Sequence, residues 1–146
     1  MKLTAVMAGV GLLFFVLPSV AKDVMHMSPI EDAMQSDVYK NRLDPNIALY
    51  FGEQSHGNVV KSLGSFPTNK KTNAFNKTDI EACEWVLLSA LLTLQERARK
   101  EGGNAVINIA SYYKKNTVVS DTQYECHTGT FIAGVALMGE VVTLAD

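Results

Sequence analysis

The fold of this chain is decided by one stretch, residues 78–103, which reads TDIEACEWVLLSALLTLQERARKEGG. It opens with a capping box, in which the Thr78 hydroxyl accepts from the third helical amide while Glu81 reaches back to the capping residue. No glycine or proline interrupts residues 82–98, and apolar residues cover most of the helix circumference in the middle two turns. A charged last turn and a glycine pair then end it. The pattern predicts one long helix over about 78–101 that is buried at its centre.

Three β-rich runs follow this helix. Residues 104–113 are rich in apolar and aromatic side chains and look like a central strand reached by a crossover connection. Residues 117–127 alternate between apolar and polar side chains, and residues 129–144 form a third apolar run. Because only short turns separate these runs, the sequence predicts a meander of three consecutive strands.

The part of the chain before the helix gives weaker signals. Strands are predicted at residues 23–27, 47–52 and 59–68, and a weak polar helix at residues 29–42. Residues 68–77 are polar and basic, and we expect an exposed connection there rather than a binding loop. Together the elements predict an α+β fold, in which a small mixed or antiparallel sheet packs on the one long central helix.

The N-terminal segment has the layout of a secretory signal peptide. A lysine at position 2 precedes an uncharged run, residues 3–17, and small residues precede Lys22. The run is shorter than the ~20 residues that span a bilayer, so we favour a cleaved signal over a transmembrane anchor. The sequence therefore predicts a signal peptide at residues 1–21 and a single α/β domain at residues 22–146. We expect a soluble periplasmic product with no stable membrane insertion after cleavage.

Cys83 and Cys126 are the only two cysteines of the chain. An exported domain matures in an oxidising compartment, where an even pair of cysteines most simply forms a disulfide. A reactive thiol or a thiolate metal ligand would need a CxxC spacing or a nearby base, and only His127 lies close in the sequence. On a strand the adjacent side chains of Cys126 and His127 point to opposite faces. We therefore predict a disulfide between Cys83 and Cys126.

The composition and motif content exclude several classes of function. The 146 residues include 13 basic and 15 acidic side chains, a net charge of −2, and 47% of them are hydrophobic. This is the balance of an ordinary globular domain, without a basic stripe or a field that gathers nucleic acid. The sequence also has no GxSxG, HExxH, Walker or CxxC motif. We predict that the protein is not an enzyme, needs no cofactor and binds no nucleic acid.

One short motif has the chemistry of a metal site. Met25, His26 and Met27 combine two thioethers with an imidazole, and such soft ligands hold Cu(I). On a strand, however, His26 faces away from the two methionines, and core packing is the alternative interpretation. His56 and His127 stand alone in the sequence, where solvent or a satisfied hydrogen bond explains a histidine.

Several sequence words resemble a family of small exported proteobacterial proteins, and the match covers most of residues 22–146. The words are KKTNAF at 70–75, ACEW at 82–85, LQERARK at 94–100, NAVINI at 104–109, SYYKK at 111–115 and YEC at 124–126. Members of this family are often mislabelled "excinuclease ATPase subunit". A repair ATPase needs a phosphate-binding loop and zinc-binding cysteine pairs, and this sequence has neither. The resemblance therefore implies an exported protein that is not a DNA-repair ATPase.

A second resemblance is architectural and covers about residues 81–144. A helix that ends in GGNAVINI at 102–109, followed by strands and a GTFIA turn at 129–133, is similar to YbjQ-type "heavy-metal-binding" domains. It is also similar to the periplasmic domain of the Rcs envelope-stress lipoprotein, from which this chain differs by lacking a lipid-anchor cysteine and having only one cysteine pair. The likeness implies a YbjQ-like α/β domain and a link to envelope stress or homeostasis. YbjQ-type proteins assemble as rings, and whether this chain forms homo-oligomers is left open.

The expected function is that of an exported periplasmic binding or interaction module. Export, one packed domain and the lack of catalytic motifs support this prediction, and the partner would be an envelope protein or a small ligand. The ligand-binding residues are not identifiable from the sequence. The alternative is a periplasmic Cu- or Zn-binding protein that uses Met25, His26 and Met27, or a site assembled around His127.

Overall fold

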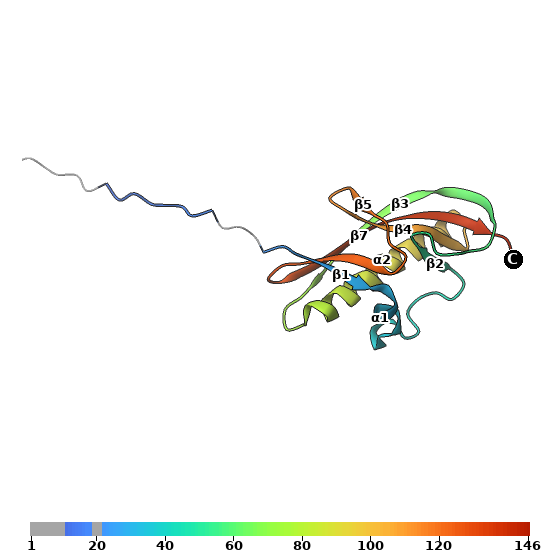
Figure 1. Ribbon diagram of the computed structural model, residues 1–146, viewed down its shortest axis with the longest axis horizontal. Coiled ribbons are helices and arrows are strands. Elements are labelled where there is room, and N and C mark those ends of the chain that lie inside the picture. The colour runs from blue at the N-terminus through green and yellow to red at the C-terminus, as the bar shows by residue number, and fades with distance from the viewer. Residues whose placement is uncertain (1–10, 19–21) are drawn as a thin grey trace, which may run out of the picture.

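A computed structural model describes residues 11–18 and 22–146 of the chain (Figure 1). Residues 11–18 form no helix or strand, and their side chains are exposed. The rest of the predicted signal peptide, residues 1–10 and 19–21, lies outside the described residues. The elements are β1 (Val24–Pro29), α1 (Ile30–Gln35), the 3-10 helix η1 (Asp37–Tyr39), β2 (Ala48–Phe51), β3 (Val59–Asn73), α2 (Asp79–Glu101), β4 (Ala105–Tyr113), β5 (Asn116–Val118), β6 (Gln123–Thr128) and β7 (Ile132–Leu144).

Helix α2 forms where the sequence predicts it. The Thr78 hydroxyl accepts from the amide of Glu81 at 3.1 Å. Gly102 ends the helix with φ 81°, in the left-handed region that glycine adopts without strain. Leu91 and Leu94 in the middle of the helix are fully buried, and burial of each such side chain stabilises the fold by about 1.5–3 kcal/mol. Within the described residues, every helix is too short or too polar to span a bilayer.

The described strands form one seven-stranded mixed sheet with β7 at its centre. β3 pairs antiparallel with β7 along its whole length, while β6 and then β4 share the opposite edge of β7. β1 pairs with β6, β2 pairs in parallel with β4, and β5 forms a hairpin with β4. The sheet therefore forks into two branches beside β7, one made of β6 and β1 and the other of β4 and β2.

Helix α2 packs against one face of this sheet, and the main core lies between them (Figure 1). Buried residues of α2 meet Val106 of β4, Val135 of β7 and Cys126 of β6. We call the opposite side of the sheet the outer face. A smaller apolar cluster lies there, made of Ala105, Ile107, Val142 and Leu144. The α+β prediction with one main helix is confirmed, although the sheet is larger than the small one expected.

Some predicted elements were wrong in extent. Residues 68–73, expected in a loop, continue β3, because each of them pairs in register with β7. Their polar and basic character fits an edge strand, whose free side faces solvent. The predicted helix at 29–42 is interrupted by Ser36, which is extended with ψ 154° and separates α1 from η1.

The predicted meander was also wrong. Residues 117–127 divide into β5 and β6, because the first part returns along β4 and the second joins β1. β6 and β4 both pair with the edge of β7 that lies opposite β3, β6 with residues 133–134 and β4 with residues 137–142, so β6 is not the middle strand of a meander. The fork in the sheet follows from this sharing of one edge.

Candidate functional site

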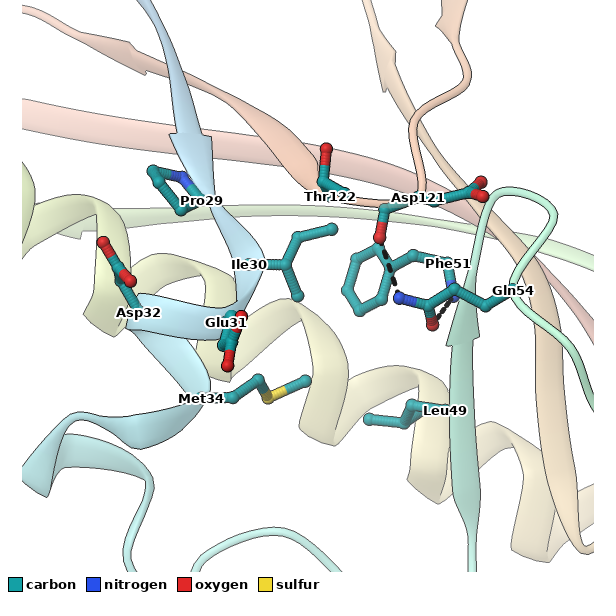
Figure 2. A pocket seen from close by; sticks show the side chains of 10 residues that line it. All are labelled: Pro29, Ile30, Glu31, Asp32, Met34, Leu49, Phe51, Gln54, Asp121 and Thr122. Atoms are coloured by element: carbon teal, nitrogen blue, oxygen red, sulfur yellow. Dashed lines mark hydrogen bonds between the residues drawn. The ribbon is translucent and has the colours of Figure 1, made fainter.

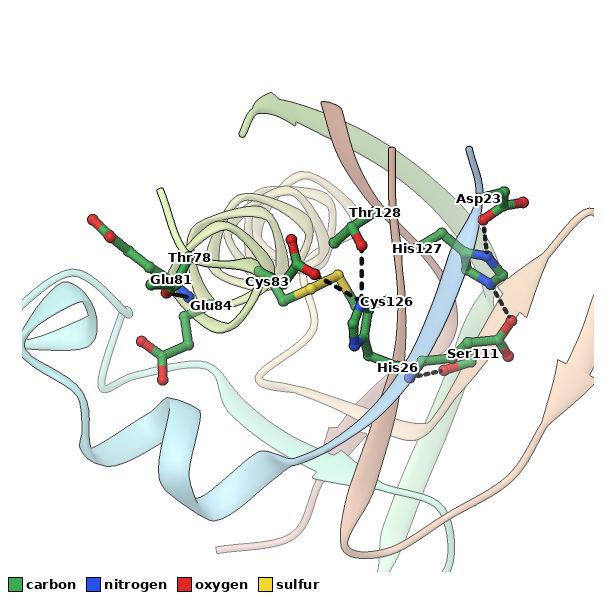
Figure 3. The surroundings of a disulfide bond; sticks show 12 residues. Asp23, His26, Thr78, Glu81, Cys83, Glu84, Ser111, Cys126, His127 and Thr128 are labelled. Atoms are coloured by element: carbon green, nitrogen blue, oxygen red, sulfur yellow. Dashed lines mark hydrogen bonds and ion pairs between the residues drawn. A yellow bond between two sulfur atoms is a disulfide. The ribbon is translucent and has the colours of Figure 1, made fainter. Parts of the chain in front are cut away.

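A disulfide between Cys83 of α2 and Cys126 of β6 confirms the predicted cysteine pair (Figure 3). The two Cα atoms lie 5.9 Å apart, a normal separation for this bond, and both residues are buried. The bond fastens the first turns of α2 to the β6–β1 branch. It also takes up both cysteines of the chain, so neither is available as a thiol.

The Met25-His26-Met27 motif lies in β1, and its residues alternate between the two faces of the sheet. His26 lies on the helix side, where its Nε2 atom is 2.8 Å from Thr128 Oγ1 and 3.4 Å from Asp79 Oδ2 (Figure 3). Met25 and Met27 point to the outer face, and Met25 is 58% exposed, so it does not pack in the core. The structure therefore does not bring the three predicted metal ligands together.

A polar cluster surrounds His127 on the outer face. The Nδ1 atom of His127 lies 2.8 Å from Asp23 Oδ1, and its Nε2 atom lies 2.5 Å from Glu125 Oε1 (Figure 3). The ring of Tyr113 stacks on the imidazole with 3.4 Å between ring centroids. The Tyr113 hydroxyl also donates to Asp23 at 3.2 Å. We call Asp23, Tyr113, Glu125 and His127 the imidazole cluster.

Two carboxylates face the two ring nitrogens of His127, and this geometry is satisfied when both nitrogens donate. The side chains of Glu125 and His127 are only 8% and 13% exposed, and the stacked ring of Tyr113 covers one side of the imidazole. The hydrogen bond from His127 lowers the pKa of Asp23, against the effect of its desolvation. The sequence interpretation of His127 as a lone histidine with satisfied hydrogen bonds missed the three partners that gather around it.

A groove of about 520 Å³ opens at the fork of the sheet. Its walls come from three separate segments of the chain: the end of β1 with helix α1, strand β2 with the turn after it, and the turn before β6 (Figure 2). We call it the fork groove. It is lined by Pro29, Ile30, Glu31, Asp32, Met34, Leu49, Phe51, Gln54, Asp121 and Thr122.

Side-chain and backbone hydrogen bonds hold the walls of the fork groove. Gln54 spans the fork, because its Oε1 accepts from the Phe51 amide at 2.9 Å and its Nε2 donates to the Asp121 carbonyl at 2.8 Å (Figure 2). On the β1 side, the amide of Ile30 donates to the carbonyl of Thr122 at 2.9 Å. The Gln54 side chain thus links the two branches across the fork, whereas the Ile30 bond continues the pairing of β1 with β6.

The fork groove combines an apolar floor with an acidic rim. The apolar side chains are those of Ile30, Met34, Leu49 and Phe51, of which Ile30 and Phe51 are buried. The charged groups of the lining are three carboxylates, those of Glu31, Asp32 and Asp121. Because no lysine or arginine lines the groove, a ligand with an apolar body and a positive charge matches its surface.

Sequence reasoning identified none of the residues of the fork groove. They come from a predicted weak polar helix at residues 29–42, a predicted strand at 47–52 with the residues just after it, and a predicted strand at 117–127. In the sequence, Glu31 and Asp32 look like ordinary surface residues. Only the fold places them in one groove with Phe51 and Asp121. For Glu125 and His127, the signal that could have placed them on one face is their alternate spacing along a predicted strand.

Neither a protein-family model, nor a curated protein, nor a solved structure matches this chain. The two resemblances described above therefore stay predictions. The functional interpretation rests on the geometry of the fork groove and of the imidazole cluster.

Proposed function

We propose that this chain is an exported periplasmic binding module that uses the fork groove to hold a positively charged, partly apolar ligand. The ligand would be a segment of an envelope protein or a small molecule. The single observation that carries this proposal is the lining of the groove, in which three carboxylates surround an apolar floor with no basic residue among them.

Charge and burial both favour such a ligand. Apolar groups that enter the groove cover Met34 and Leu49, which are only half-buried, and this removes apolar surface from water. A lysine or arginine side chain is well suited to the rim, because its apolar stem can lie on the floor while its charged end meets Glu31 or Asp32. A negatively charged ligand would meet repulsion from the same carboxylates.

The export part of the proposal rests on the N-terminal sequence and on the cysteines. Residues 1–21 have the layout of a signal peptide, and a disulfide such as Cys83–Cys126 persists in an oxidising compartment. The resemblance to the Rcs sensor domain supports a role in envelope stress or homeostasis rather than in DNA repair. We further propose that the protein acts by binding and not as an enzyme.

Titration with two matched peptides tests the groove. The protein is produced from the full chain and purified from the envelope fraction. It is then titrated in a calorimeter with amidated Lys-Leu-Lys-Leu and with amidated Glu-Leu-Glu-Leu. We expect the cationic peptide to bind and the anionic one not to bind. The Glu31→Gln/Asp32→Asn variant should weaken the cationic peptide about tenfold, because two partly exposed charge contacts are worth about 1.4 kcal/mol together.

The control removes two carboxylates elsewhere. Glu96 and Asp146 are exposed and do not line the fork groove, so Glu96→Gln/Asp146→Asn should leave the affinity unchanged. Equal affinity for the two peptides would refute the proposed charge preference. Equal weakening by the two double variants would show that the peptide responds to net charge and not to the groove.

A further inference from the structure

We propose that the outer face of β1 and β6 carries a Cu(I) site, formed by the thioethers of Met25 and Met27 and the imidazole of His127. The site keeps the two methionines of the sequence motif but replaces His26 with the histidine of the neighbouring strand. It goes beyond the proposed peptide binding, because none of its three ligands lines the fork groove.

Hydrogen bonds of neighbouring residues show that the three ligands share one face. Asp23, one residue before β1, contacts His127, and Met25 and Met27 follow Asp23 at alternate positions. Alternate residues of a strand point to the same side. His26 lies between the two methionines in sequence and contacts Thr128 on the other side of the sheet, so it is excluded from the site.

The strand register places the methionines within reach of the imidazole. Met25 lies directly opposite His127, and Met27 lies opposite Glu125, the next residue of β6 on the same face. Opposite residues of an antiparallel pair have Cβ atoms about 4.5–5.5 Å apart, and diagonal neighbours are about 7–8 Å apart. A methionine side chain has three rotatable bonds, and Met25 is largely exposed, so both sulfur atoms can approach the ring without movement of the backbone.

The donor set selects the metal. Within the described ranges, no group of three His, Cys, Asp or Glu side chains is arranged to hold a metal ion, so a hard or borderline ion lacks a full set of ligands. The two thioethers are soft donors that select Cu(I), and the imidazole is a borderline donor that copper also accepts. On binding, one ring nitrogen of His127 gives up its proton to solvent and its hydrogen bond to a carboxylate, and its lone pair then binds the metal.

The rest of the imidazole cluster positions the ring. The nitrogen that does not bind the metal stays hydrogen-bonded to its own carboxylate, Asp23 or Glu125, which fixes the ring orientation. Tyr113 covers one flat side of the imidazole, which leaves the edge with the nitrogen atoms for the metal. A hollow of about 510 Å³ borders His127, and Lys22 and Lys71 line it together with Asp23 and Tyr113.

If the methionines had only a structural role, their replacement would have a different effect from the one expected for a Cu(I) site. Met25 and Met27 would then only shield Glu125 and His127 from water, and leucine would do so equally well because it has a similar volume. The replacement of methionine by leucine removes the sulfur donors and keeps the apolar cover. It therefore separates metal binding from packing.

The test is a competition for Cu(I). The untagged protein, produced from the full chain and purified from the envelope fraction, is titrated under argon against the bicinchoninate complex of Cu(I). We expect one Cu(I) per chain. The Met25→Leu/Met27→Leu variant should bind about 100-fold more weakly, and His127→Gln should show a similar loss, because each removes donors that the ion prefers.

Two control variants keep the ligands and change the same residue types elsewhere. Met138→Leu replaces a methionine outside both the proposed Cu(I) site and the fork groove, and His26→Gln replaces the histidine of the helix face; both should bind Cu(I) like the wild type. The proposal is overturned if Met25→Leu/Met27→Leu binds as tightly as the wild type, or if His26→Gln loses affinity while His127→Gln does not. Urea unfolding of each variant confirms that a loss of affinity does not come from a loss of fold.

Discussion

The two sides of strand β6 differ in what their side chains contact. On the helix side, Cys126 is bonded to α2 and is surrounded by apolar residues of the main core. On the outer face, His127 contacts Glu125 and Asp23, and the ring of Tyr113 stacks on it. The side chains on one side of this strand therefore pack in the core, and those on the other side form a polar cluster. The comparison predicts that substitutions on the helix side cost far more stability than substitutions on the outer face.

Removal of the disulfide should have the largest effect on stability. The bond closes a loop of 43 residues, and in the loop-entropy model this constraint is worth about 4 kcal/mol. We expect Cys83→Ala/Cys126→Ala to lower the free energy of unfolding in urea by about that amount. Reduction of the wild-type disulfide should give the same loss. A loss below about 1 kcal/mol would mean that the helix side does not depend on this bond.

A core leucine should come next, and its sequence neighbour provides the control. Leu91 is fully buried against the sheet, whereas Leu92 is 36% exposed on the same helix. Leu91→Ala should cost about 3 kcal/mol, since it leaves a cavity, and Leu92→Ala less than about 1 kcal/mol. Urea unfolding of both variants measures the difference. Equal losses would contradict the position of the core between α2 and the sheet.

The features of the fold that local sequence signals define were predicted well, and the others were not. Helix α2 was predicted with its cap and its end, because the Thr78 cap and the apolar spacing are local signals. The disulfide was predicted because an exported chain with two cysteines leaves one pairing. The last third of β3 was missed, since the polar residues of an edge strand resemble those of a loop.

The functional surfaces depend on contacts between distant segments. The fork groove unites residues from β1 to the turn before β6, and its shape follows from the sharing of one edge of β7 by β6 and β4. In the same way, the replacement of His26 by His127 as a candidate ligand depends on the register of β1 against β6. Alternation along β1 showed that His26 and the two methionines diverge, but no local pattern showed which histidine lies opposite Met25.

After the disulfide and Leu91, the smallest of the three main stability effects is expected for the pair of Glu125 and His127, and a double-mutant cycle measures it. The variants Glu125→Gln, His127→Gln and their combination remove a short hydrogen bond between two side chains that are only 8% and 13% exposed. We expect a coupling energy of about 1–2 kcal/mol, because such a bond gains strength from charge but the pair pays desolvation. Urea unfolding gives the four free energies of the cycle.

The contact between Asp23 and His127 provides the internal control, because Asp23 is half-exposed and solvent screens it. Asp23→Asn should therefore cost less stability than Glu125→Gln. A Glu125–His127 coupling as large as the Leu91→Ala loss would contradict the expected difference between the two sides of β6. The outer face would then contribute as much to stability as the helix side does. In that case the buried carboxylate would be part of the structural core. A small coupling leaves His127 free to exchange one carboxylate for another ligand at low cost, which is what a binding site on this face requires.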